Sequence, residues 1–328
     1  VIKLAEKSLV LWPIKPIDAI SSFNTIAANI GSAIYNDNEK LSLFRNGENT
    51  FFIRHSTKPK NLSHGLERLS VIKGEDNNIN QRPFLTYYVM GEHRWRHSDS
   101  WPLKNTKYTK WYLDHSVQAN SLSGDGTLTI VKPLKEKNDS FVYDPEDPVP
   151  SRGGHISCTG TDTEAGGYDQ TEIERRGDVL VYSSPILKKG IEVTGLIKAN
   201  LFVTSSAKDT DFTVKLVDVY PDGRAFNVQE GVIRMRYRES LRSPSLINPG
   251  QIYEVEVDLN ATSNFFSEGH KIRVEVSSSS FPRIERNLNT GEENYKGTHF
   301  ISATNTILLG GKYASYIELP VIERVDRE

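Results

Sequence analysis

The sequence lacks the motif that would give a serine strong nucleophilic character. Serine hydrolases built on an α/β sheet present the serine in Gly-x-Ser-x-Gly, because the glycines relieve crowding at the sharp turn between a strand and a helix. No such pentapeptide occurs in the 328 residues, and the nearest string, Gly154 to Cys158 (GHISC), lacks the second glycine. A serine hydroxyl without an adjacent base is a weak nucleophile. We therefore expect no serine nucleophile in this chain.

Two other spacings could place a nucleophile beside a base. Cys158 follows His155 in a loop, so a Cys–His pair is one interpretation and a small buried thiol is the other. Ser205 and Lys208 match Ser-x-x-Lys, but this short string falls at a strand end and is interpreted as a chance match. Cys158 is the only cysteine, which excludes an intrachain disulfide and a cysteine-ligated zinc site and fits a reducing, cytoplasmic location.

Clusters of acidic residues raise the question of a calcium site, because calcium favours carboxylate oxygens from loops. These clusters contain no twelve-residue ligand pattern, so exposed acidic loops explain them, and we expect neither a metal nor a cofactor. The acids concerned are Asp139, Asp144, Glu146, Asp147, Asp209 and Asp211.

An aromatic and basic cluster begins the part of the chain that is rich in strand signals. Such rings could stack on sugars, as in a lectin, or could pack one domain against another, since large aromatic side chains dominate buried interfaces. Packing is the favoured interpretation. The cluster consists of Trp95, Trp101 and Trp111 with His93, Arg94 and His97.

The elements that must position these groups are mostly strands. Between Asp211 and Arg238 apolar residues alternate with polar ones, and Pro221-Asp-Gly223 supplies a turn. Alternation around a turn predicts antiparallel strands with one buried face, continued here through Ile233, Met235 and Tyr237. Eight or more strands with little helix predict a β-sandwich. The other expected strands are Leu85–Met90, Lys110–Leu113, Thr127–Val131, Val179–Ser183, Ile191–Thr204, Tyr253–Leu259, Lys271–Val276 and Ile317–Val321, with a long loop over Tyr143–Gly167.

The first 83 residues have a different pattern. Their apolar spacing predicts one or two helices over Ile17–Ala33, a short strand over Thr50–Ile53 and an amphipathic helix over Gly65–Ile72. We therefore expect two domains, residues 1–83 and residues 84–328.

Composition argues against several classes of partner. A net charge of −2 gives no electrostatic reason to bind nucleic acid or an anionic membrane, and no apolar run is long enough to cross a bilayer. The N-terminus has an acid within a short apolar stretch and no small-residue cleavage pattern, so it is a poor signal peptide. Because the chain begins with Val1, a fragment, a processed form and an unusual start codon are all open.

The residues from Asp209 to Ala225 read DTDFTVKLVDVYPDGRA, and further specific strings flank them in a fixed order. These strings are Tyr88–Trp95, Ser100–Leu103, Tyr143–Gly154, Ala261–Asn264 and Val276–Arg283. Together they resemble the CocE/NonD family of serine hydrolases, whose architecture X-prolyl dipeptidyl-peptidases and α-amino-acid ester hydrolases share. The resemblance covers roughly Pro83 to Val321. It implies that residues 84–328 form a jelly-roll β-sandwich of the galactose-binding-like type, and residues 1–83 the closing part of an α/β-hydrolase domain.

The resemblance also implies candidate site residues. His55 follows the apolar strand Phe51–Ile53, where the family places its general base, and Asp37 resembles the turn that holds the family's acid. The family's Gly-Pro-Trp pattern before the histidine is absent, so a surface histidine and an Asn/Asp-rich turn are the alternatives. His155 and Ile156 lie in the part of the sandwich that approaches the acyl pocket, and are expected at its rim.

Two functional hypotheses follow. The first is the C-terminal portion of a hydrolase that cleaves a small acyl ester, an amide or an X-Pro dipeptide by acyl-enzyme chemistry, with the sandwich supporting the active site and this chain inactive by itself. The second is a non-catalytic jelly-roll module that binds carbohydrate or protein. In either case, an apolar face that would dock against a catalytic domain could drive self-association.

Overall fold

The computed structural model describes residues 83–155 and 165–323, together with the backbone of four short strands that precede them. Contacts divide the chain into two compact units, which we describe separately. The first unit comprises Val1–Thr86, His97–Asp99 and Ser157–Thr159, and the second comprises the remaining residues. The division into domains 1–83 and 84–328 stays a prediction.

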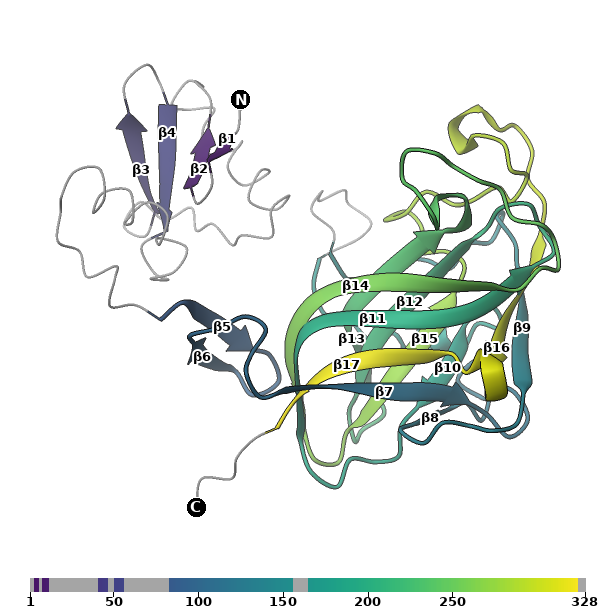
Figure 1. Ribbon diagram of the computed structural model, residues 1–328, viewed down its shortest axis with the longest axis horizontal. Coiled ribbons are helices and arrows are strands. Elements are labelled where there is room, and N and C mark those ends of the chain that lie inside the picture. Colours follow the sequence, from purple (N-terminus) through teal and green to yellow (C-terminus); the bar gives the residue numbers. More distant parts are fainter. Residues whose placement is uncertain are drawn as a thin grey trace. The chain divides into compact units, whose positions relative to one another are not determined.

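The first unit contains a four-stranded antiparallel sheet in the order β1-β2-β4-β3 (Figure 1). Its strands are β1 (Lys3–Ala5), β2 (Ser8–Leu11), β3 (Leu41–Asn46) and β4 (Thr50–His55). The strand predicted over Thr50–Ile53 is therefore present, and His55 is its last residue. The helices predicted over Ile17–Ala33 and Gly65–Ile72 lie outside the described residues.

The second unit is built mainly of strands, as the alternating pattern predicts. A two-stranded sheet, β5 (Leu85–Val89) with β6 (Arg94–Ser98), leads into it. The longer strands are β7 (Thr106–Asp114), β11 (Ile191–Ser205), β12 (Asp211–Val219), β13 (Ala225–Arg234) and β14 (Tyr253–Phe266). The shorter ones are β8 (Thr127–Thr129), β9 (Lys137–Tyr143), β10 (Leu180–Ser183), β15 (Lys271–Ser277), β16 (Ala303–Leu309) and β17 (Tyr316–Ile322).

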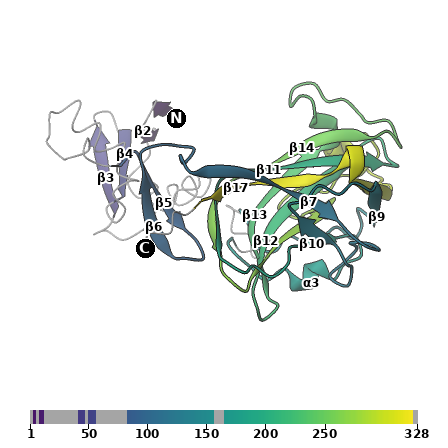
Figure 2. The ribbon, with the colours of Figure 1, turned by 60° about the horizontal axis from the view of Figure 1, so that its bottom comes forward.

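These strands form one sheet that doubles back on itself to make two layers. The hydrogen-bonded order is β13-β12-β15-β10-β8-β7-β17-β11-β16-β9, with β14 beside β11. In Figures 1 and 2, β14, β11, β17 and β7 form one layer, and β13, β12, β15 and β10 form the other. The fold is therefore a β-sandwich of the predicted jelly-roll class.

The core lies between the two layers, because strands of both layers direct their apolar side chains to the same cluster. Phe212 and Leu216 of β12 are fully buried in this cluster, as are Val257 of β14 and Val274 of β15. Full burial of each such side chain stabilises the fold by roughly 1.5–3 kcal/mol. The predicted turn between β12 and β13 is confirmed, since Gly223 has φ +92° and its N–H donates to the carbonyl of Tyr220.

Two details of the strand prediction were wrong. First, β13 ends at Arg234, and Met235–Tyr237 form the 3₁₀ turn η2 instead of continuing the strand. The reason is local, because the backbone N–H of Arg236 donates to the carboxylate of buried Asp209 and so leaves the strand pattern. Second, the paired strands β9 and β16 were not expected. They place the polar residues Asp139 and Asn305 on their buried faces, which hides the apolar alternation.

Helices are few and short in the described part of the chain. They are α3 (Thr171–Glu174) and the 3₁₀ turns η2 (Met235–Tyr237), η3 (Asn294–Lys296) and η4 (Gly311–Tyr313). None of the helices described is long and apolar enough to span a lipid bilayer.

Candidate functional site

The segment between β9 and β10, residues 144–179, runs over one edge of the sandwich, and we call it the covering segment. It is described over 144–155 and 165–179. Backbone hydrogen bonds attach it at several places: for example, the N–H of Ser151 donates to the carbonyl of Phe281 at 2.6 Å, and the N–H of Gln170 donates to the carbonyl of Ala225 at 2.7 Å. The candidate pocket-rim residue His155 belongs to this segment, so these attachments decide where that residue lies.

A pair of glycines closes the loop that contains His155. The N–H of Gly154 donates to the carbonyl of Gly166 at 2.7 Å, and the N–H of Gly166 donates back at 3.1 Å. Gly154 has φ +88°, and a Cβ there would lie 1.9 Å from Oε1 of Glu230. A larger residue would therefore meet both backbone strain and a clash. His155, the next residue, is exposed.

Gln170 connects the covering segment to the sheet beneath it. This side chain is fully buried, and its Nε2 donates to the carbonyls of Arg152 and Tyr168 and to Oδ1 of Asn227. Its Oε1 accepts a hydrogen bond of 2.7 Å from Nζ of Lys215 on β12. Because buried amides and ammonium groups are costly to leave unpaired, this network holds the segment in one position.

A pair of buried carboxyl groups holds the helix of the covering segment. Glu174 accepts a hydrogen bond of 2.6 Å from Nη1 of Arg273, and Glu275 pairs with Nζ of Lys215 at 3.1 Å. Burial, and then the negative charge of Glu275, raise the pKa of Glu174 to about 7. One oxygen of each carboxyl group has no hydrogen-bond partner, so a proton on Glu174 shared with Glu275 would satisfy both.

Two histidine–carboxylate pairs, one buried and one partly buried, lie elsewhere in the sandwich, and the sequence reasoning did not anticipate either. Nδ1 of His270 lies 2.8 Å from Oδ1 of Asp218, and Nδ1 of His115 lies 3.3 Å from Oδ1 of Asp139. Such pairs can orient a general base. Within residues 83–155 and 165–323, however, no serine, threonine or cysteine side chain hydrogen-bonds to either imidazole, so neither pair has a nucleophile to activate.

A hydroxyl does contact an imidazole on the two-stranded sheet, where Thr86 Oγ1 and Nδ1 of His97 share a hydrogen bond. A catalytic pair needs a third group that orients the imidazole and amides that converge on the developing oxyanion. In the part of the chain that the structure describes, no carboxylate contacts His97. We therefore interpret this contact as a surface hydrogen bond between neighbouring strands.

The other predicted site residues fall largely outside the described part. The backbone of His55 is paired with Leu41 in the first unit, but its side chain is not described. Asp37, Ile156 and Cys158 lie outside the described residues, so the Asp37–His55 and Cys158–His155 pairs stay predictions. Ser205 is buried, and its Oγ accepts a hydrogen bond from the N–H of Ala207, which is a structural role in a turn.

The expectation of exposed acidic loops was wrong for three residues. Asp139, Asp209 and Asp211 are almost completely buried. Asp211 forms a two-pronged ion pair with Arg234, directly opposite it on β13, and Asp209 pairs with Arg236 at 2.8 Å. Buried carboxylates require such partners. This pairing explains why two acids begin the hairpin sequence and two arginines end it. Within the described ranges, no three His, Cys, Asp or Glu residues come together as metal ligands would.

The three tryptophans of the aromatic cluster do not form one surface. Trp111 packs in the sandwich core, whereas Trp95 and Trp101 are exposed. Trp95 lies against Tyr88, with 5.2 Å between the ring centroids. Packing is therefore the role of Trp111.

The described residues thus form a sandwich with the covering segment attached to it, and they contain no assembled catalytic centre. The fold and the site therefore define the class of non-catalytic β-sandwich domains. The family described as the X-Pro dipeptidyl-peptidase C-terminal non-catalytic domain matches residues 77–318. Because the match covers most of the chain, the chain belongs to the CocE/NonD hydrolase family as its C-terminal, non-catalytic part.

Two curated relatives are esterases. The chain is 47% identical over 255 residues to the cocaine esterase of Rhodococcus sp. (strain MB1 Bresler), covering 77% of this chain and 44% of the esterase. It is 27% identical over 275 residues to a putative serine esterase of Mycobacterium bovis, covering 77% of this chain and 39% of that protein. The chain therefore spans less than half the length of either relative.

Solved structures of hydrolases share the fold. An aminopeptidase from a marine sediment archaeon (Thaumarchaeota archaeon) superposes with a TM-score of 0.67 at 27% identity, covering 83% of this chain and 46% of that one. An α-amino acid ester hydrolase superposes with a TM-score of 0.65 at 27% identity, covering 73% and 41%. A CocE/NonD family hydrolase from Staphylococcus aureus, at 17% identity and a TM-score of 0.57, supports the fold.

Proposed function

We propose that this chain is the C-terminal portion of a hydrolase that cleaves small acyl esters, amides or X-Pro dipeptides by acyl-enzyme chemistry, with the sandwich supporting the active site and this chain inactive by itself. One observation carries the proposal: the chain is 47% identical to a cocaine esterase over 255 residues, yet these correspond to only 44% of that enzyme. A serine nucleophile and its oxyanion hole would then belong to the part of the enzyme that this sequence does not contain.

In this proposal the covering segment borders the substrate pocket through His155 and Ile156. Its support is the firm attachment of the loop, since the Gly154–Gly166 pair and Gln170 define where His155 leaves the sandwich. Because Gly154 is fixed by these bonds, the backbone of His155 leaves the sandwich at a defined point, where its side chain would contribute polarity to a pocket. His155 and Ile156 would then affect the choice of substrate and not the chemical step.

His55 and Asp37 remain the proposed base and acid of the catalytic triad. Their chain order, acid before histidine, agrees with that of α/β-hydrolases. Without a serine that His55 can activate, this pair supports no turnover in the isolated chain.

Labelling with a fluorophosphonate, followed by intact-mass measurement, tests the proposal. The reagent reacts with serines that a neighbouring base activates, so we expect no mass increase on the purified chain. An adduct that depends on His55, and is therefore lost in His55→Ala, would contradict the proposal. Ser157→Ala is the matched control, because Ser157 occupies the nearest string to a nucleophile motif.

We also propose that the chain self-associates through an exposed apolar face next to β5 and β6. Tyr88, Met90, Trp95 and Trp101 are all exposed large side chains of the second unit. Exposed apolar patches commonly mark association sites. We expect the mass from light scattering to rise with concentration, and Trp101→Ser to reduce this rise, whereas Leu241→Ser, at an exposed apolar site in a different loop, leaves it unchanged. A constant mass of 37.0 kDa for the unmodified chain would exclude self-association.

A further inference from the structure

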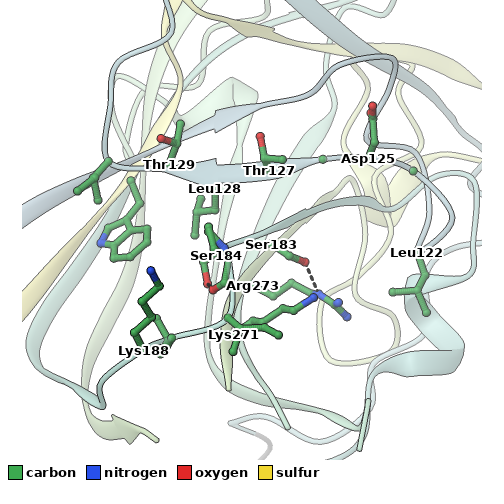
Figure 3. A pocket seen from close by; sticks show the side chains of 17 residues that line it. Leu122, Asp125, Thr127, Leu128, Thr129, Ser183, Ser184, Lys188, Lys271 and Arg273 are labelled. Carbon is green, nitrogen blue, oxygen red and sulfur yellow. Dashed lines mark hydrogen bonds between the residues drawn. The ribbon is translucent and has the colours of Figure 1, made fainter. Parts of the chain in front are cut away.

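A surface hollow of about 820 Å³ lies where β8, the start of β15 and the connection from β10 to β11 meet (Figure 3). Its size is within the range of small-molecule sites. It is built from residues outside the covering segment, since its walls come from residues 122–130, residues 183–188, Trp111, Lys271 and Arg273. None of the candidate catalytic or pocket-rim residues Asp37, His55, His155 and Ile156 lines it.

The hollow contains two lysines that lack a counter-charge. Lys188, on the connection from β10 to β11, and Lys271, the first residue of β15, both line it. Within the described residues neither ammonium group has an ion-pair partner. In Figure 3 both side chains lie on the same side of β8. Two cationic groups that line the same hollow give it a positive potential, which favours the entry of an anion.

The other charged groups of the hollow do not cancel these lysines. Arg273 is already balanced, because its Nη1 pairs with Glu174 at 2.6 Å. Asp125 lies at the opposite end of the hollow from Lys188 in Figure 3. Its carboxylate accepts hydrogen bonds of 2.9 Å from the backbone N–H groups of Val117 and Gln118. The hollow therefore keeps a net positive charge.

Apolar surface makes up the rest of the hollow. Ile130 and Ile186 both line it and expose 62% and 60% of their surface. The ring of Trp111 also borders it, although this residue is nine-tenths buried. The Nε1–H of Trp111 is buried without a hydrogen-bond acceptor. An unpaired buried donor is unfavourable, and an oxygen atom of a ligand that reached it would remove that cost.

We propose that this hollow binds a small organic anion with an apolar body, namely a carboxylate attached to an aromatic or branched aliphatic group. The carboxylate would lie between Lys188 and Lys271, where charge attraction favours it. The apolar body would lie against Ile130, Ile186 and Trp111, where burial removes exposed apolar surface from water. A neutral molecule of the same shape would gain only the second contribution.

Ligand-observed NMR titration with 2-naphthoate, and with the neutral 2-naphthamide as its matched probe, tests this site. We expect 2-naphthoate to bind with a Kd on the order of 1 mM, as for a small fragment. The amide should bind at least about tenfold more weakly, because it lacks the charge. Added salt should weaken the binding of the carboxylate and leave that of the amide unchanged, because salt screens charges near the surface.

Variants locate the binding. Lys188→Gln combined with Lys271→Gln should weaken 2-naphthoate binding at least about tenfold, whereas Lys189→Gln, an exposed neighbour that does not line the hollow, should change it less than about twofold. If the double variant loses its far-UV circular dichroism spectrum, the exposed single change Lys188→Gln replaces it, with an expected weakening of about threefold. Equal binding of acid and amide would overturn the proposal. So would unchanged binding in the folded lysine variants, or no binding of 2-naphthoate at millimolar concentration.

Discussion

Two residues, Gly154 and Gln170, fix the point at which the chain leaves the sandwich at His155. Position 154 favours glycine because its φ of +88° strains any residue with a Cβ, and a Cβ there would also displace the carboxylate of Glu230. Gln170 saturates both ends of its amide inside the protein. Neither role could be predicted from the sequence, since Lys215 lies 45 positions away from Gln170 and no local pattern connects them.

Glu174 should make stability depend on pH. Burial and the charge of Glu275 raise its pKa from 4.5 to about 7, so the folded state holds this proton more tightly than the unfolded chain does. The contribution of this group to the free energy of unfolding is therefore fully present below about pH 4.5 and is lost as the pH rises to about 7. We expect a loss of roughly 3 kcal/mol over this window.

Glu174→Gln should remove this loss, because glutamine keeps the shape and cannot ionise. The measurement is urea unfolding of the sandwich at about pH 5 and at about pH 7.5, because most of the change in the protonation of Glu174 falls between these two values. Glu172→Gln is the matched control, since Glu172 lies on the same helix and is exposed. A pH dependence in Glu174→Gln as steep as that in the unmodified chain would show that another group causes it.

At the scale of elements, the β12–β13 hairpin combines an apolar inner face with charged pairs along its length. Its strands could be predicted because Phe212, Val214 and Leu216 alternate with polar residues. The end of β13 could not be predicted, because the alternation of arginines with apolar residues continues unbroken from the strand into the 3₁₀ turn. Strands β9 and β16 were not predicted because one inward position in each holds a buried polar residue, Asp139 in β9 and Asn305 in β16, which interrupts the apolar alternation.

The buried ion pair of this hairpin should matter far more than the exposed one. Arg234→Met would leave the Asp211 carboxylate buried without its cation, which typically destabilises a protein by about 3–5 kcal/mol. Arg224→Met removes the partner of Asp222 in the exposed turn of the same hairpin, and should destabilise the protein far less, because water screens exposed pairs. Urea unfolding monitored by circular dichroism measures both. Equal destabilisation by the two changes would contradict the structural role assigned to Asp211.

At the scale of the whole molecule, fold and family follow from the same residues. The strings that resemble CocE/NonD hydrolases include β12, the start of the covering segment and the loop after β15. Strand β12 contributes to the core, and the loop after β15 attaches the covering segment. The sandwich, the family and the lack of a nucleophile motif were therefore all accessible from sequence. The pairs that attach the covering segment were not, because Glu174 and Arg273 are 99 positions apart and meet only when the sheet forms.

Ester hydrolysis by the purified chain tests the central claim most directly. With p-nitrophenyl acetate as substrate, we predict release of p-nitrophenol at the rate of buffer alone, because the sequence contains no Gly-x-Ser-x-Gly motif. The rate should be the same for the unmodified chain and for His55→Ala. Turnover that is saturable and is abolished by His55→Ala would show that this chain contains a working catalytic centre, and would contradict the account.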